Sequence, residues 1–543
     1  MDGKQLNLFG FLHQNIKSVI ISIVVVCLGY GFSLASVSIS VDDTAFDVYF
    51  DMGYSIRMGR LIMPLLQKIL DIVEFTPFWL ETIAVLFMLL AGWMMAFLLF
   101  IISNKNLSAI FLTAFVSIFI SYPLINEIFI YSSMAVSVGL GYFLVAYSLY
   151  YFHLFEKNKS KKNIIFSVLF LTGAVSLYES FIPAFFCCIM IIIFIKCWYN
   201  SICLKTATQK ISLSILVGLL SMIINSVISN CLISILNLRT LRIVADKNVI
   251  WLDGNFSQNV KSVLRTLFYD QFIAGFEYLP ITIFALSGII LITFSIYKTF
   301  KQRNCFLLVC LVGIFVSAEL IVFLQGETYY RNCQSFALIA ALACALSVEK
   351  MYQMKYRKIA VGLLIVLILV QTQDLSRWFY LENQLAEAES NLISNIIVDL
   401  KSNSLEGKRI AFVYDYNEAD ELSYYSNYNS ISANSFLRKA VNKIADKFAY
   451  TSTPEFKMEL NRKHNQTNCG MTFLMYGTVG FDGEIIGPNY ELKEYMQPFF
   501  FNFTQVTWDE YHTAQDIAEG MNSYPQDGYW KKVNDYYIVK IGI

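Results

Sequence analysis

Long apolar segments constrain this chain more strongly than any other feature. Of its 543 residues, 56% are hydrophobic and only 15% are charged, whereas a soluble domain carries about 25% charged residues. A helix needs roughly 20 apolar residues to cross a bilayer. Eleven segments have this character: residues 18–39, 78–103, 107–125, 131–152, 163–178, 181–197, 211–235, 279–297, 305–324, 334–349 and 359–372. We therefore expect an all-α polytopic membrane domain with about 11 transmembrane helices.

Lysines and arginines gather at alternate connections between these spans. The N-terminus is basic, and so are the segments after the second, fourth, sixth, eighth and tenth spans, with residues such as Lys105, Lys161, Lys205, Lys301 and Lys355. Such residues are enriched on the cytoplasmic side of a membrane. We predict a cytoplasmic N-terminus. An odd number of spans then places the C-terminal part outside.

Composition changes near residue 374. Residues 1–374 hold the apolar runs, whereas residues 375–543 are richer, per residue, in Asn, Asp, Glu and Lys. Shorter patterns in the second part predict a helix at 381–400 and strands at 409–416, 471–477 and 535–542. We predict a membrane domain over residues 1–374 and a small extracytoplasmic α/β domain over residues 375–543.

Charge, histidines and cysteines exclude some functions. A net charge of zero argues against a nucleic-acid binder. The four histidines are scattered, and neither CxxC nor HxxxH occurs, so a tightly held zinc site is not expected. No cofactor is predicted, and a role for a divalent metal stays open. Most cysteines lie in apolar runs, where they act as small hydrophobes; whether Cys333 and Cys469 pair also stays open.

Two adjacent aspartates, Asp42 and Asp43, follow the first span and begin the outer loop 40–77. Carboxylates beside hydrocarbon are costly and usually functional. Apolar residues recur at near-helical spacing at Val48, Met52 and Ile56, and the pattern can be extended to Ile62 and Leu66, which predicts a helix in the membrane interface. The pair would stand at its N-terminus, a favourable place for carboxylates. Helix capping and chemistry are both open interpretations of this pair.

Sugar transfer from a lipid-linked donor would use such residues. It needs a base for the acceptor hydroxyl and cations for the departing phosphate, and Asp42 or Asp43 could be the base. Arg60 and Arg57 follow in the same loop, and the planar guanidinium suits phosphate. The alternative for Arg57 is pairing with nearby aspartates or lipid headgroups.

A second cation, Arg331, lies at the outer end of the ninth span in the sequence QGETYYRNCQS. It is a candidate for a further phosphate contact, with Tyr329 or Tyr330 against the sugar or the lipid. An ion pair with Glu327, four residues earlier, explains the arginine equally well.

The turn SLYES, residues 176–180, joins the short fifth and sixth spans. Tyr178 and Glu179 would lie below the membrane surface or at the base of a cavity. Irregular backbone at that depth must face protein or water. Both are candidates for substrate binding, and a hydrogen-bonded structural acid is the alternative for Glu179.

The first loop resembles that of the bacterial Gtr-type O-antigen glucosyltransferases, which belong to the GT-C superfamily. The likeness rests on the paired aspartates, then Gly59, Arg60 and Pro64. The SLYES turn, the outer loop 237–278 and the C-terminal YPQDGYWKKVNDYYIVKI are also similar. The family pattern often has an arginine a few residues after the paired acids and a tryptophan before the Gly-Arg pair. This chain has Phe46 or Asp47 and Tyr54 in those regions, so the sugar and the phosphate contacts stay open.

This resemblance implies a multi-pass enzyme of the bacterial inner (plasma) membrane. Its donor would be glucose or another hexose on polyprenyl phosphate, used at the periplasmic face. The acceptor would be a lipid-linked polysaccharide such as the O-antigen of lipopolysaccharide, and one displacement would invert the anomeric centre. Partner proteins would synthesise the lipid-linked sugar and flip it.

Two other functions stay open. Polysaccharide polymerases and ligases carry an arginine-rich outer loop, and loop 237–278 holds Arg239, Arg242 and Arg265. A transporter or flippase of lipid-linked sugars would favour paired repeats and charges at the membrane midplane, whereas the acids here gather at one face.

Overall fold

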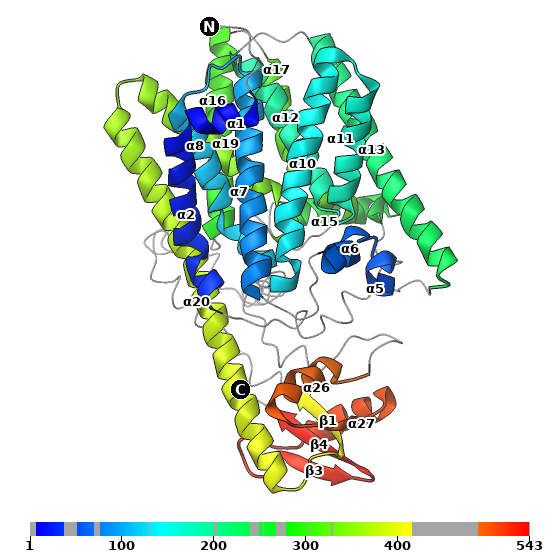
Figure 1. Cartoon of the computed structure of the whole chain (residues 1–543). Coiled ribbons are helices and arrows are strands. Elements are labelled where there is room, and N and C mark those ends of the chain that lie inside the picture. Colours follow the sequence, from blue (N-terminus) through cyan, green and yellow to red (C-terminus); the bar gives the residue numbers. More distant parts are fainter. Residues whose placement is uncertain are drawn as a thin grey trace.

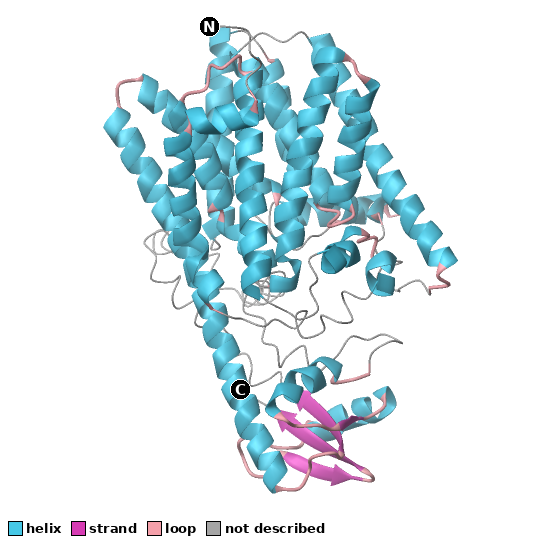
Figure 2. Cartoon of the chain, viewed as in Figure 1, coloured by secondary structure: helices cyan, strands magenta, loops and turns pink. Residues whose placement is uncertain are grey.

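The computed structural model describes residues 7–36, 52–69, 77–129, 131–199, 204–238, 249–252, 255–267, 279–302, 305–326, 330–414 and 487–541. Within these ranges the chain forms a bundle of long helices followed by a small body of helices and strands (Figures 1 and 2). This confirms the predicted fold class.

Every predicted span coincides with a helix of the bundle. These helices are α2 (Ile16–Ala35), α7 (Pro77–Ile102), α8 (Ala109–Ile120), α10 (Ser132–Asn158), α11 (Lys161–Val175), α12 (Phe181–Tyr199), α13 (Leu204–Ile235), α16 (Leu279–Gln302), α17 (Phe306–Ala318), α19 (Ser335–Gln353) and α20 (Arg357–Ser402). Among the described residues, nine helices are long and apolar enough to cross a membrane. The chain is therefore a membrane protein.

Three of the predicted spans form helices that are short for a membrane crossing. α8 has 12 residues, α11 has 15 and α17 has 13, so they extend about 18, 22 and 20 Å, less than the hydrocarbon thickness of about 30 Å. α8 is followed by the short helices η1 (Pro123–Ile125) and α9 (Asn126–Phe129), and α17 is followed at Glu319 by α18 (Leu320–Gln325).

The bundle has two chemically different ends. At one end lie α1 (Leu8–Gln14) and the lysine-bearing helix ends, here called the basic end (Figure 1). At the other lie short helices of the connecting segments, here called the loop end: α5 (Met52–Arg57), α6 (Ile62–Ile69), η1 (Pro123–Ile125), α9 (Asn126–Phe129), η2 (Ile250–Leu252), α15 (Phe256–Leu264) and η5 (Tyr330–Asn332). Successive long helices run in alternate directions between these ends, as the lysine pattern predicts.

Close approach of backbones holds the centre of the bundle together. α10 packs against both α7 and α11. A Cβ atom on Gly139 of α10 would lie 2.1 Å from the carbonyl oxygen of Ala84 on α7, so only glycine fits there. Small residues at helix crossings allow such contacts in membranes, where van der Waals packing rather than the hydrophobic effect drives helix association.

α13 leaves one apolar face outside the bundle. Leu216, Ile223 and Val227 are 51%, 55% and 54% exposed. A continuous apolar face of this kind is rare on a soluble monomer. Lipid would cover it in a membrane, which agrees with the hydropathy of the helix.

α20 connects the bundle to the C-terminal body as one helix of 46 residues. The sequence predicts a span at 359–372 and a separate helix at 381–400, but the structure joins them. Ile393, Ile396, Ile397 and Leu400 at its far end are buried in the core of the C-terminal body. The predicted domain boundary at 374 falls inside this helix and stays a prediction.

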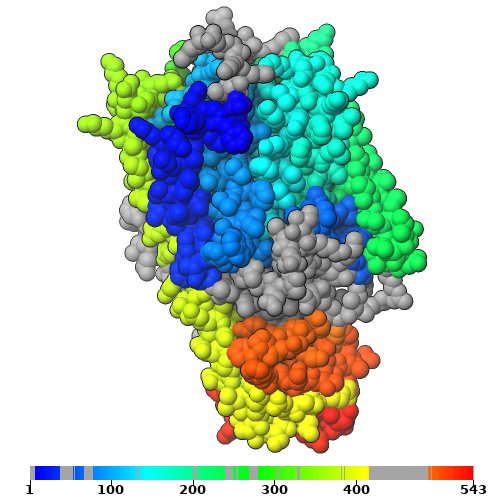
Figure 3. All heavy atoms as spheres, viewed as in Figure 1, coloured from blue at the N-terminus to red at the C-terminus, as the bar shows by residue number. Residues whose placement is uncertain are grey.

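The C-terminal body contains a four-stranded sheet in the order β2-β1-β4-β3. Its elements are β1 (Arg409–Tyr414), α26 (Tyr490–Met496), η6 (Gln497–Phe499), β2 (Thr504–Gln505), α27 (Trp508–Ala518), β3 (Trp530–Val533) and β4 (Tyr536–Ile541). β1 pairs in parallel with β2 and β4, and β3 is antiparallel to β4. Two strands match the predictions at 409–416 and 535–542, while 471–477 lies outside the described residues. In the space-filling view these residues form one body beyond the loop end (Figure 3).

Candidate active site

The loop end holds the described residues among those predicted to take part in chemistry. α2 ends at Ala35 at this end, and α5 begins there at Met52. Asp42, Asp43 and Tyr329 themselves lie outside the described residues, so their roles stay predictions.

The Gly-Arg motif forms a tight turn between α5 and α6. Gly59 has a φ of +74°, a left-handed conformation that glycine adopts without strain. Its amide donates to the carbonyl of Ile56 at 3.0 Å, and the amide of Arg60 donates to that of Ser55 at 2.8 Å. This is a Schellman ending of α5. The structure therefore has two short helices where the periodicity predicts one.

A neighbouring helix fixes this turn. The side-chain Nδ2 of Asn225 on α13 donates to the carbonyl of Gly59 at 3.1 Å. Arg60 thus belongs to a turn that is fixed by hydrogen bonds to α5 and by a hydrogen bond from α13.

Arg60 lies against a residue of the SLYES turn. Its Cζ is 5.3 Å from the centroid of the Tyr178 ring, which is within the range of a cation–π interaction. The Tyr178 hydroxyl donates to Oδ1 of Asn332 at 2.9 Å, and Asn332 directly follows Arg331 in η5. Arg60 and Arg331, which come from distant parts of the sequence, therefore belong to one connected surface.

The structure also describes the two other charged candidates. Glu179 is exposed rather than buried. Nε of Arg57 donates to the carbonyl of Gly53 on its own helix at 3.0 Å. The proposed roles of both residues stay predictions.

A cavity with about 240 Å³ of empty space opens beside Arg331. Its walls come from η1, α9, α10, η5 and the start of α19, with Tyr122, Leu124, Ile125, Ile128, Val138, Tyr142, Tyr330, Arg331, Cys333, Gln334 and Ala337 in the lining. Of these, Arg331 is half-buried and the rest are buried. Arg331 therefore marks the mouth, and Tyr330 is part of the wall.

Buried acids at the loop end were missed by the sequence analysis. Glu81 on α7, Glu127 on α9 and Glu319 between α17 and α18 are all buried, and Glu319, the most exposed of them, shows only 6% of its surface. Ser33 donates a hydrogen bond to Glu81. Ionisable residues within a membrane bundle usually mark a functional region. Each acid stands in or beside an apolar run, and an acid in that position is itself a sequence signal of a functional region.

The comparison with known families decides the class of the protein. A family model described as "Glucosyl transferase GtrII" matches residues 31–348, more than half of the chain. This chain belongs to the GtrII glucosyl transferase family. No curated protein and no solved structure matches it significantly. The predicted Gtr-type resemblance is confirmed, and the protein is a glycosyltransferase that acts on a sugar donor and an acceptor.

The GtrII match covers the surface described above. It begins in α2, ends in α19, and includes Arg60, Tyr178, Arg331 and Gln334. It stops before α20 and the sheet, so the family likeness rests on the bundle and its loop end.

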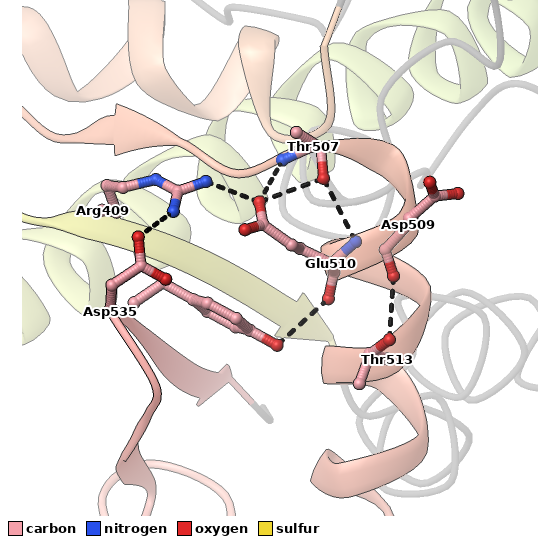
Figure 4. Close-up of polar contacts among 7 residues, drawn as sticks. Arg409, Thr507, Asp509, Glu510, Thr513 and Asp535 are labelled. Atoms are coloured by element: carbon pink, nitrogen blue, oxygen red, sulfur yellow. Dashed lines mark hydrogen bonds and ion pairs between the residues drawn. The ribbon is translucent and has the colours of Figure 1, made fainter.

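The C-terminal body of this GtrII protein contains a polar network of its own (Figure 4). Arg409 of β1 contacts Asp535 and Glu510, the latter at 2.6 Å. The amide of Thr507 donates to Glu510 at 2.8 Å, which closes the capping box of α27. This hydrogen bond, with Arg409 adding to it, lowers the pKa of the Glu510 carboxyl. The network joins strand, turn and helix, and we interpret it as structural.

Metal binding and the disulfide are not decided by the described residues. Within those ranges, no three side chains of His, Cys, Asp or Glu come together as a metal site, and the acidic stretch 42–51 lies outside them. Cys333 is buried in the wall of the cavity, while Cys469 lies outside the described residues, so their pairing stays open.

Proposed function

We propose that this GtrII family member transfers a hexose, with glucose as the expected sugar, from polyprenyl phosphate to a lipid-linked surface polysaccharide such as O-antigen. The observation that carries the proposal is the line of contacts from Arg60 through Tyr178 to Asn332, beside Arg331. It places two guanidinium-bearing segments at one end of a glucosyltransferase bundle. A phosphate-linked donor is the substrate that such an arrangement suits.

The proposed reaction is a single displacement. A carboxylate of Asp42 or Asp43 takes the proton of the acceptor hydroxyl, whose oxygen attacks the anomeric carbon. The bond from that carbon to the phosphate oxygen breaks, and polyprenyl phosphate leaves with the electron pair. One such step inverts the anomeric centre. General-base assistance of this kind contributes about 10²- to 10⁴-fold to a rate.

The arginines would stabilise the charge that develops on the leaving phosphate. Arg60 and Arg331 are the principal candidates, and Arg57 is a third. The ring of Tyr178 limits the motion of the Arg60 fork, which favours a bidentate contact. Tyr329, Tyr330 and Glu179 are proposed to contact the sugar or the lipid.

The orientation in the membrane is part of the proposal. The basic end would face the cytoplasm of a bacterium, and the loop end and the C-terminal body would lie on the periplasmic or extracellular side of the plasma membrane. The donor would then be made inside and flipped outward by partner proteins. Residues 1–374 would form the catalytic domain and residues 375–543 the outer domain.

A donor assay on the purified full chain tests this function. Polyprenyl phosphates carrying glucose or another hexose are offered with a lipid-linked glycan, and release of polyprenyl phosphate is measured. We expect consumption of one such donor. Asp42→Asn or Asp43→Asn should lower kcat by at least about 100-fold, while Asp516→Asn, at an exposed acid of α27, should leave it unchanged.

The outcomes separate the alternatives. Full turnover by both aspartate variants removes the proposed base. Elongation or transfer of whole glycans from a lipid diphosphate, without use of a monophosphate donor, would identify a polymerase or ligase. Movement of lipid-linked sugar across vesicles without any transfer would identify a flippase.

A further inference from the structure

One buried amide in the cavity beside Arg331 has no explanation in the fold. Gln334, the residue before α19, is 6% exposed. Neither Oε1 nor Nε2 of its side chain has a hydrogen-bond partner. Leaving such groups unpaired in an apolar surrounding is destabilising. Buried polar groups of this kind in native proteins call for a functional or solvent partner.

The neighbours of Gln334 hold its backbone but leave the amide of its side chain available. The Tyr142 hydroxyl donates to the backbone carbonyl of Gln334 at 2.9 Å, and the Tyr122 hydroxyl donates to the carbonyl of Pro280. Both phenol hydroxyls are thus engaged with backbone. Gln334 therefore contributes unpartnered polar atoms to a lining that is otherwise largely apolar.

The size of the cavity limits what can reach this amide. The space at its centre accommodates one water-sized group, and ligand pockets that enclose whole molecules are usually roughly 300–1,000 Å³. A whole hexose does not fit, but a single hydroxyl entering past Arg331 does. A hydroxyl both donates and accepts, and a carboxamide offers both complements.

We propose that Gln334 reads one hydroxyl of the donor hexose and so determines which sugar is used. This inference rests on the proposed function. Arg331 at the mouth would contact the phosphate while the sugar presents one hydroxyl inward. The start of α19, a helix of 19 residues, adds a positive dipole end near the anion. Sites that hydrogen-bond a hydroxyl reject analogues lacking it more strongly than apolar sites can reject an added group.

Gln334→Leu tests the inference, because leucine keeps much of the volume and removes both polar atoms. Wild-type and variant proteins are assayed with polyprenyl-phosphate glucose and with its 2-, 3-, 4- and 6-deoxy analogues. In the wild type we expect kcat/KM to fall about 100-fold for one analogue. In Gln334→Leu, kcat/KM for the parent donor should fall about 10- to 100-fold, and that one discrimination should shrink to within about threefold.

A stability measurement accompanies the kinetics. Removing unpaired polar atoms from an apolar cavity should leave the thermal unfolding temperature of Gln334→Leu unchanged or higher. Gln371→Leu is the matched control. Gln371 is also buried, on α20, has an unpaired Nε2, and accepts from Ser121 at 2.7 Å, but it does not line the cavity. It should keep the wild-type pattern of discrimination.

The possible results are distinguishable. If the wild type transfers glucose but Gln334→Leu keeps its discrimination against every deoxy donor, the role of Gln334 is refuted and the proposed function stands. An equal loss with all donors together with a lower unfolding temperature also refutes it, since that marks a structural amide. A wild type that uses no polyprenyl-phosphate hexose overturns both proposals.

Discussion

Arg60 is placed by two contacts of different kinds. Its backbone belongs to the turn that Asn225 holds, and its guanidinium lies over Tyr178. A long side chain free in solvent loses about 2 kcal/mol of rotamer entropy when it is fixed on a substrate. Because the ring already restricts Arg60, part of that cost is met before the substrate binds.

Substitutions of Tyr178 distinguish the contribution of its ring to activity from that of its hydroxyl. Tyr178→Phe keeps the ring under Arg60 and loses only the hydrogen bond to Asn332, so kcat/KM should stay within about tenfold of wild type. Tyr178→Leu also removes the cation–π contact and should lower kcat/KM by about 10- to 100-fold. Steady-state kinetics on purified protein measure this. Equal activity of the leucine variant would show that the ring does not position Arg60.

Glu510 makes the C-terminal body sensitive to acid. Its folded pKa lies below the ordinary value of 4.5, chiefly because the Thr507 amide donates to the carboxylate. The stabilisation is therefore fully present above about pH 4.5 and is lost as the pH falls through the lower, folded pKa. Hydrogen exchange of β1 and α27 in the full chain should show less protection in Glu510→Gln than in wild type at pH 6.5. The difference should shrink as the pH falls below about 4.5 and through the lower, folded pKa, and a difference that grows in acid would contradict this sign.

At the scale of elements, α13 holds the turn between α5 and α6 that carries Arg60. Asn225→Leu removes the hydrogen bond to Gly59 and should lower kcat/KM about 10-fold while leaving the unfolding temperature within a few degrees of wild type. Asn230→Leu is the control, because Asn230 lies on the same helix, is exposed, and donates to the Ser226 hydroxyl on that helix. Comparable losses in both variants would show a general effect on α13.

The crossing of α7 and α10 depends on the absence of a side chain at Gly139. Gly139→Ala would put a methyl group against the carbonyl of Ala84, so the helices must separate. Overpacking of this kind costs about 1–3 kcal/mol, which should appear as a lower unfolding temperature and a lower yield of monodisperse protein. Gly362→Ala on α20, where nothing lies within 4 Å, should be neutral. An unchanged Gly139→Ala protein would show that the crossing tolerates a shift.

At the scale of the whole molecule, the segregation of charge predicts how the chain sits in a membrane. The basic end and the loop end are separated by the length of the bundle. In intact cells a membrane-impermeant maleimide should therefore label Glu519→Cys, in the C-terminal body, and should not label Lys161→Cys until the cells are opened. Labelling of Lys161→Cys from outside would reverse the proposed orientation.

Sequence patterns predict the helices of this molecule better than they predict the contacts between those helices. Long apolar runs locate each span, and short strand-like runs locate β1 and β4, because both are local features of the sequence. The contact between Arg60 and Tyr178 depends on tertiary packing, which periodicity does not encode. Gln334 carries no signal either, since a glutamine before a helix is unremarkable until its burial is known. The sequence predicts two helices where α20 is one, because polar residues after 372 end the apolar run without ending the helix.

The continuity of α20 has a geometric consequence for the C-terminal body. At about 1.5 Å of rise per residue, its 46 residues extend about 69 Å. Each residue also turns the chain by about 100° around the helix axis. One inserted residue would therefore swing the sheet through more than a quarter turn. Seven would restore its azimuth to within about 20° while moving it about 10 Å farther out. The number of residues in α20 therefore sets both the direction in which the C-terminal body faces and its distance from the bundle.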